Sequence, residues 1–171
     1  MVIKGTHLLA AVGILILLGA AVFGIGYSLR PTDEHKIRGQ FRTLSERVSK
    51  TKKEGVISAA GTAQAVSKLF TNSVTVEIVG LAWNSGPYSR ESIAANVLRG
   101  RALFDSIRLS FDDMEIEVSG TRAKTFTSAV LSGVLHDGRK IREVRELETI
   151  LKKNGSEWLF SSFKAREIIK K

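Results

Sequence analysis

The sequence contains no cysteine, only two prolines and only three histidines among its 171 residues. Without cysteine there is no disulfide framework, no thiolate metal site and no cysteine nucleophile. The histidines, His7, His35 and His136, are too scattered for a histidine-rich metal site. No phosphate-binding loop, dinucleotide-binding glycine pattern, nucleophile elbow or zinc-protease motif occurs. We therefore expect no metal and no cofactor.

Charged residues are also missing from one long stretch. Residues 5–29 contain no Asp, Glu, Lys or Arg, whereas residues 31–171 carry 24 basic and 17 acidic side chains, a net charge of +7. The whole chain has a formal charge of +9, and its length is typical of one domain with an appendage. This division predicts an N-terminal tail with a membrane segment over residues 1–30 and a folded domain over residues 31–171.

The membrane segment is predicted over residues 8–27, a run of twenty residues without a charged side chain. A helix of this length rises about 30 Å, the thickness of the hydrocarbon core of a bilayer. A cleaved signal peptide is the alternative, but it has a shorter apolar run and an A-x-A-like cleavage site, which this segment lacks. We expect a single-pass transmembrane helix, with the lipid bilayer as a partner.

The side of the membrane on which the domain lies is open at this stage. Basic residues near the span are more numerous on its C-terminal side, and the positive-inside rule then favours a cytoplasmic domain. A short basic tail before one apolar helix is instead typical of a signal anchor, so we favour export. The membrane-proximal basic residues, which suit anionic headgroups, are Arg30, Lys36, Arg38 and Arg42. Nucleic acid is not expected, since no recognition helix or stacking platform accompanies the basic residues.

Three helices are predicted after the membrane segment. Over residues 34–53 the apolar positions are spaced four, three and four residues apart, as on one helix face. They are Ile37, Phe41, Leu44 and Val48. A second helix is predicted over residues 58–70. A third begins after Ser89 as its N-cap and ends near residue 104. Its predicted apolar face contains Ile93, Val97, Leu98 and Leu103.

Strands are predicted by an apolar period of two. A short strand over residues 74–79 precedes a loop over residues 80–87, and four further strands cover residues 106–118, 123–135, 140–152 and 158–169. The apolar parity changes at Asp112-Asp113, which indicates a β-bulge. Asp137-Gly138 and Asn154-Gly155 are typical of hairpin turns. The predicted fold class is therefore α+β, with three helices packed on a curved, mostly antiparallel sheet.

This order of elements resembles the nuclear transport factor 2-like superfamily, which includes SnoaL-like cyclases, ketosteroid isomerases and many domains that only bind. The resemblance covers residues 33–169. It rests on the amphipathic helix of residues 37–48, the helix start at residues 89–93, the bent strand through Asp112 and the Gly-x-x-Trp segment at residues 155–160. The resemblance implies a cone-shaped fold with a pocket between the sheet and the helices.

A ketosteroid-isomerase-like site needs a general-base carboxylate together with a tyrosine and a neutral acid as oxyanion donors. The carboxylates considered for a catalytic role are Asp112, Asp113 and Glu143. No complete set of roles can be assigned to them, and Asp112 and Asp113 are equally typical of exposed turn carboxylates. Whether the domain is an enzyme is therefore open.

Arg145, Tyr88 and Trp83 are the candidate pocket or ligand-binding residues. Arg145 shares a strand face with Leu147 and Leu151, which indicates that this face is buried. Trp83 and Tyr88 precede the third helix, where aromatic residues either line a pocket, contact a partner or cover the core. The hydrophobic residues Trp158 and Phe160 are predicted core.

These observations favour a membrane-anchored domain without catalytic activity that binds a small apolar ligand or a protein partner. A homodimer formed through the sheet face is one possible arrangement. Two alternatives stay open: a SnoaL-like isomerase, cyclase or hydrolase acting near the membrane, and a scaffold subunit of an envelope complex.

Overall fold

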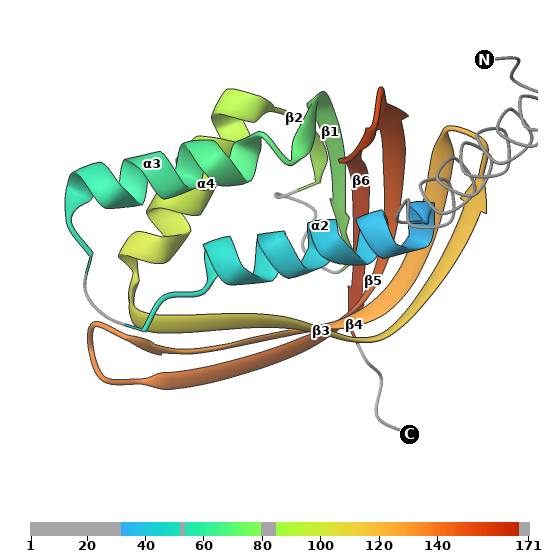
Figure 1. Ribbon diagram of the computed structural model, residues 1–171. Helices are drawn as coiled ribbons and strands as arrows, with labels where there is room; N and C mark the ends of the chain where they lie inside the picture. Colours follow the sequence, from blue (N-terminus) through green and yellow to red (C-terminus); the bar gives the residue numbers. More distant parts are fainter. Residues whose placement is uncertain (1–31, 52–53, 80–84, 168–171) are drawn as a thin grey trace, which may run out of the picture. The chain divides into compact units, whose positions relative to one another are not determined.

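The computed structural model describes residues 32–51, 54–79 and 85–167 (Figure 1). By its internal contacts the chain divides into residues 1–32 and 33–171. In the described part of the second unit, three helices lie on one face of a curved, six-stranded sheet (Figure 1). The predicted α+β class is therefore confirmed for this unit.

The helix α2 (Asp33–Val48) packs on the sheet through the face that its apolar spacing predicts. Ile37, Phe41 and Leu44 are buried on this face. The helix ends at Val48 rather than at residue 53, because the backbone of Lys50 pairs with that of Ile107 instead. The two residues exchange N–H···O bonds of 2.8 and 2.9 Å in an isolated β-bridge.

The helices α3 (Val56–Ser67) and α4 (Arg90–Ala102) pack against each other. The predicted N-cap of α4 is confirmed, since the Ser89 hydroxyl accepts a hydrogen bond of 3.2 Å from the Ser92 N–H. The predicted apolar face of α4 is partly wrong. Its buried residues are Ala94 and Arg101, whereas Leu103 is 61% exposed. The buried side of α4 depends on its packing against α3, and the apolar periodicity of α4 does not predict that contact.

The sheet has the strand order β2-β1-β6-β5-β4-β3. The strands are β1 (Phe70–Ile78), β2 (Gly86–Ser89), β3 (Phe104–Ser119), β4 (Arg122–Leu135), β5 (Lys140–Asn154) and β6 (Glu157–Glu167). β1 and β6 are parallel, and the other neighbouring pairs are antiparallel. β2 and β3 therefore form the two edges of the sheet, on opposite sides of the domain.

The strand β2 is absent from the sequence prediction, which places a loop over residues 80–87. In the structure its residues pair with β1, with Tyr88 opposite Val74. Gly86 and Pro87 are typical of turns, so these residues do not show the apolar alternation that predicts a strand. Proline is tolerated in it because β2 is an edge strand.

The predicted bulge in β3 is confirmed. The register between β3 and β4 shifts between Asp112 and Glu115, and Asp113 adopts a φ of 52°. The Thr127 hydroxyl donates a hydrogen bond of 2.7 Å to the Asp112 carbonyl and so holds the irregular backbone in place.

The two predicted hairpin turns are confirmed as well. Gly138 follows β4 with a φ of 83°, and Gly155 follows β5 with a φ of 61°. Glycine adopts this left-handed conformation without steric strain. The antiparallel part of the sheet is therefore built from short, local connections.

Aromatic and aliphatic side chains fill the space between α2 and the sheet. The Phe41 ring packs edge-on against Phe111 and Phe160, with ring centroids 5.0 Å apart in both pairs. Phe160 also contacts Phe70, with centroids 5.4 Å apart. Trp158 and Phe160 are completely buried, which confirms their predicted place in the core.

Within the described residues no helix is both long enough and apolar enough to cross a bilayer. The longest described helix, α2, has 16 residues and a polar outer face. The predicted membrane segment over residues 8–27 lies outside the described residues, as do Arg30 and Trp83.

Candidate functional site

A cavity of about 510 Å³ opens between the N-terminal turns of α3 and the C-terminal end of α4. This volume lies within the roughly 300–1,000 Å³ range of small-molecule sites. Its apolar lining residues are Val56, Ala59, Leu98 and Ala102, and its polar ones are Lys50, Glu54, Arg101 and His136. Although half of these residues carry polar groups, most of the lining surface is apolar, as in many ligand sites.

Arg101 forms a buried part of the cavity wall and is only 6% exposed. Its Nη1 donates hydrogen bonds of 2.6 Å to the carbonyls of Arg47 and Val48 and a longer bond of 3.3 Å to that of Ser49. These carbonyls lie at the C-terminal end of α2, where a helix has no partners of its own for them. Arg101 thus caps α2 from a different helix.

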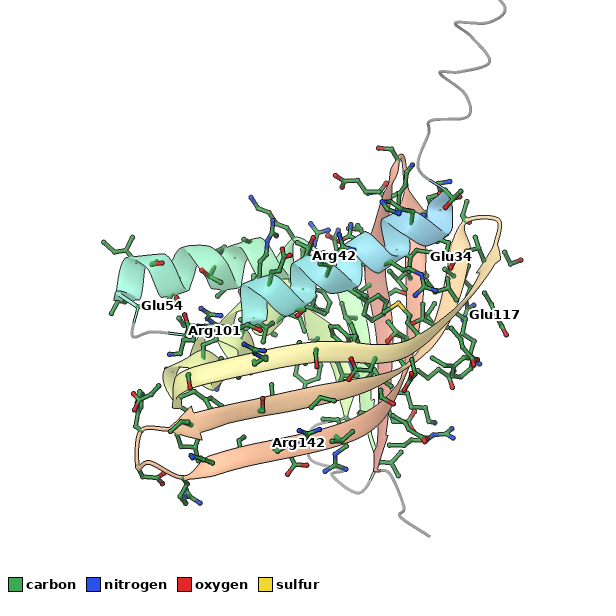
Figure 2. The ribbon with its side chains drawn as sticks, turned by 60° about the horizontal axis from the view of Figure 1, so that its bottom comes forward. Glu34, Arg42, Glu54, Arg101, Glu117 and Arg142 are labelled. Carbon is green, nitrogen blue, oxygen red and sulfur yellow. The ribbon has the colours of Figure 1, made fainter. Side chains whose placement is uncertain are left out.

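The charge of Arg101 is compensated by Glu54, which precedes α3. Arg101 Nη2 donates to Glu54 Oε2, and Figure 2 shows the two side chains beside the C-terminal end of α2. The two remaining buried polar atoms of this pair, Glu54 Oε1 and Arg101 Nε, are without a hydrogen-bond partner among the described residues. The opposite charges of the two side chains cancel, so the pair contributes no net charge to the cavity.

The His136 ring lies between two oxygen atoms beside the cavity. Its Nδ1 is 2.6 Å from Asp105 Oδ1, and its Nε2 is 2.6 Å from the Ala102 carbonyl oxygen. Because a carbonyl oxygen only accepts hydrogen bonds, Nε2 is the donor to Ala102. The two contacts fasten the turn after β4 to the end of α4, and both ring nitrogens contact protein groups.

The interior between α2 and the sheet contains few polar side chains. Those that are buried in the described part of the chain are Ser67, Arg101, Thr125, Thr127 and Thr149. Thr125 and Thr149 lie opposite each other on β4 and β5, and each hydroxyl is fully buried without a hydrogen-bond partner among these residues. A threonine hydroxyl does not ionise near neutral pH and therefore does not serve as a general acid or base, in contrast to a carboxylate or an imidazole.

The structure places Asp112 and Asp113 at the bulge of β3, where both side chains are exposed. Asp113 lines an open groove between α2 and β3, together with Arg38 and Arg42. Arg38 Nη2 is 2.9 Å from a carboxylate oxygen of Glu34 and 3.2 Å from the Met114 carbonyl oxygen. These side chains surround a surface groove rather than a pocket within the fold.

The other predicted site residues lie apart from this bulge. Glu143 is 60% exposed on β5, with its Oε2 3.6 Å from Arg145 Nη2. Arg145 is half-buried on the same strand face as the buried Leu147, as its alternation predicts. Tyr88 is half-buried on β2, at the edge of the sheet opposite β3. The structure therefore does not bring Tyr88 together with Asp112 or Asp113.

The predicted membrane-proximal residues that are described lie on α2. Arg38 and Arg42 are exposed, and Figure 2 shows Arg42 on the outer side of the helix. Lys36 is half-buried, and its ammonium lies 3.5 Å from the Ser156 carbonyl oxygen. The described part of α2 thus presents two cations to solvent.

Sequence reasoning misses the residues that form the cavity. Arg101 follows Val97 and Leu98 at the helical spacing of four and three residues, which places it on their apolar face. This spacing is the one signal that could have identified a buried arginine. Asp105 and His136 have no such signal, because they are separated by 31 residues and meet only through the β3–β4 pairing.

Solved structures resemble this domain. A nuclear transport factor 2-like protein with a cystatin-like fold from Novosphingobium aromaticivorans has 16% sequence identity and a TM-score of 0.61, with 90% of each chain covered. The fold is nuclear transport factor 2-like. A candidate scytalone dehydratase from the same organism has 14% identity and a TM-score of 0.65, with 80% of this chain and 85% of that chain covered.

A candidate dehydratase of the nuclear transport factor 2-like family from Streptomyces avermitilis is a third similar structure. It has 13% identity and a TM-score of 0.62, with 81% of this chain and 97% of that chain covered. No family model matches the sequence, and no curated protein matches it with significance. At these identities the similarity shows the fold, while function depends on the individual site.

Proposed function

We propose that this nuclear transport factor 2-like domain is a non-catalytic binding module that holds a small apolar ligand between α3 and α4. The composition of the interior carries the proposal: its buried described residues are aliphatic, aromatic, Ser or Thr, with Arg101 as the one ionic exception. Arg101 is occupied by Glu54 and by the end of α2. The buried described residues thus include no acid–base pair, whereas the α3–α4 cavity offers apolar space.

A SnoaL-like or dehydratase-like enzyme is the second candidate. It is favoured by the fold neighbours that carry the name of candidate dehydratases. Such an enzyme needs a base whose lone pair faces the substrate. The His136–Asp105 pair is the acid–base group nearest the cavity, but its second ring nitrogen is held by the Ala102 carbonyl. We therefore place the binding module first.

We further propose that residues 8–27 anchor this domain in a membrane and that the domain is exported. The uncharged twenty-residue run and the short basic tail before it support this arrangement. The exposed cations Arg38 and Arg42 follow soon after the segment and suit an anionic lipid surface. The excess of basic residues on the C-terminal side of the span is the argument for a cytoplasmic domain instead.

A benzene titration followed by methyl NMR tests the binding proposal, with the full chain held in phosphatidylcholine nanodiscs. Benzene is a suitable probe because it enters apolar cavities of proteins. We expect the methyl signals of Val56 and Leu98 to shift as benzene is added. The variant Ala59→Trp fills the cavity and should abolish these shifts.

The matched control is Gln64→Trp, which adds the same ring to α3 at an exposed position away from the cavity. This control should leave the benzene-induced shifts intact. Wild-type protein whose Val56 and Leu98 signals do not respond to benzene would show that the cavity is not a binding site.

A further inference from the structure

The charges that line the α3–α4 cavity leave one cation uncompensated. Arg101 is paired with Glu54, and the His136 ring lies against the Asp105 carboxylate. Lys50 is the remaining charged lining residue, and its ammonium forms no ion pair or hydrogen bond within the described part of the chain. The lining therefore has an excess of one positive charge.

Lys50 is held in place by its backbone rather than by its side chain. Its N–H and carbonyl form hydrogen bonds of 2.8 and 2.9 Å with Ile107 on β3. The backbone of Lys50 is thus fixed beside the cavity, and its ammonium is not committed to another protein group among the described residues. A cation arranged in this way can form a charge-assisted hydrogen bond with an anionic ligand.

The segments that line the cavity also carry exposed apolar side chains, and one of them, Val56, is a lining residue. Val56 and Ile57, in the first turn of α3, are 82% and 91% exposed, and Leu103 after α4 is 61% exposed. Exposed aliphatic residues that adjoin an apolar cavity typically mark a binding surface. A ligand with a hydrocarbon tail would cover them and remove this apolar surface from water.

We propose that the ligand of this cavity is an amphiphile with one anionic headgroup and a hydrocarbon chain, the chemistry of a fatty acid or of an anionic lipid of the bilayer. The headgroup binds the Lys50 ammonium, and the hydrocarbon chain lies between α3 and α4. This inference rests on the proposed binding function and adds the class of ligand to it. The single excess cation of the lining favours one anionic headgroup, and the apolar lining residues favour a hydrocarbon chain.

Photo-crosslinking tests the inference, again with the full chain in phosphatidylcholine nanodiscs. The probe is a palmitate analogue with a diazirine in its tail, and labelled peptides are identified by mass spectrometry. We expect labelling of peptides from α3 and α4. Unlabelled palmitate should compete with the probe about tenfold better than cetyl alcohol, which has the same tail without the charge.

Two lysine variants locate the headgroup. Lys50→Gln should reduce labelling about tenfold, because it removes a charge-assisted hydrogen bond. Lys68→Gln removes an equal charge from an exposed position outside the cavity lining and should leave labelling unchanged. Equal labelling of wild type and Lys50→Gln would overturn the assignment of Lys50.

The two sources of such a ligand are separated by adding phosphatidylglycerol to the nanodiscs. Suppression of labelling by palmitate alone assigns a free fatty acid, and suppression by phosphatidylglycerol as well assigns the bilayer as a source. Both results support an anionic amphiphile.

The failure of this inference differs from the failure of the proposed function. If cetyl alcohol competes as well as palmitate and Ala59→Trp abolishes labelling, the cavity binds apolar ligands but the anionic class is wrong. If labelling of α3 and α4 persists in Ala59→Trp or never occurs, the amphiphile inference is wrong, whereas the proposed function is wrong only if benzene also leaves the Val56 and Leu98 signals unchanged.

Discussion

At the scale of single residues, Arg101 connects three segments of the domain. It belongs to α4, caps the carbonyls at the end of α2 and pairs with Glu54 before α3. A buried charge is tolerated when hydrogen bonds and an opposite charge satisfy it, and removal of one partner leaves the other unpaired. Arg101 thereby fixes the elements that surround the cavity.

The variant Arg101→Met should destabilise the domain by about 3 kcal/mol, because it leaves Glu54 uncompensated in a largely buried position. The double variant Arg101→Met/Glu54→Met should recover part of this loss. Urea denaturation of both variants in the same membrane mimic measures the difference. If the double variant is less stable than Arg101→Met alone, the ion pair is not the source of the effect.

Asp33 predicts a pH dependence at the start of α2. Its carboxylate accepts hydrogen bonds of 2.8 Å from the Lys153 ammonium and 3.1 Å from the Trp158 ring N–H. These bonds, that of Lys153 above all, hold the pKa of Asp33 below its ordinary value of 3.8. A carboxyl whose pKa is lowered by folding stabilises the folded state above the ordinary value, and this contribution is lost as the pH falls through the lowered pKa.

Thermal denaturation of wild type and Asp33→Asn therefore should show a pH-dependent difference. We expect wild type to be the more stable protein near neutral pH and the two melting temperatures to converge below the ordinary pKa of 3.8. A difference that stays constant over the whole pH range would mean that the Asp33 charge does not contribute.

At the scale of elements, α2 protects the exposed edge of β3. The Ser45 hydroxyl donates a hydrogen bond of 2.5 Å to the Leu109 carbonyl, and the Ser49 hydroxyl accepts one of 3.0 Å from the Leu109 N–H. Unpaired edge strands invite association with other chains. The helix thus satisfies backbone groups of β3 that no further strand pairs with.

The elements were largely predictable because their signals are local. The spacing of Ile37, Phe41 and Leu44 predicts the buried face of α2, Ser89 predicts the start of α4, and the parity change at Asp112 predicts the bulge. The end of α2 was not predictable, because it depends on the pairing of Lys50 with β3. The strand β2 was not predictable for a similar reason, because its residues become a strand only through pairing with β1.

Two glycines test the packing of these elements. A Cβ at Gly133 on β4 would lie 2.5 Å from the Ser106 carbonyl oxygen and 2.8 Å from the Phe104 ring, whereas a Cβ at Gly61 on α3 meets nothing within 4 Å. Gly133→Ala should therefore destabilise the domain by about 1–3 kcal/mol. Gly61→Ala should stabilise it by about 0.5–1 kcal/mol through helix propensity. Urea denaturation measures both, and a stabilising Gly133→Ala would contradict the close approach of β4 to β3.

At the scale of the whole molecule, the apolar composition of the buried core and the α3–α4 cavity together support the proposed function. The cavity lining comes from four separate segments: Lys50, the start of α3 with Glu54, the end of α4 and the turn after β4. No local pattern links these segments. For this reason the candidates chosen from the sequence, among them Asp112 and Arg145, do not include the residues that line it.

The benzene titration tests the proposed binding site most directly when the methyl signals of two groups of residues are compared. Val56 and Leu98 lie at the cavity, and Val66 and Leu151 are buried in the hydrophobic core. We predict that benzene shifts the signals of the first pair and leaves those of the second pair in place. Shifts at Val66 and Leu151 without shifts at Val56 and Leu98 would reveal an interior pocket and contradict a binding site between α3 and α4.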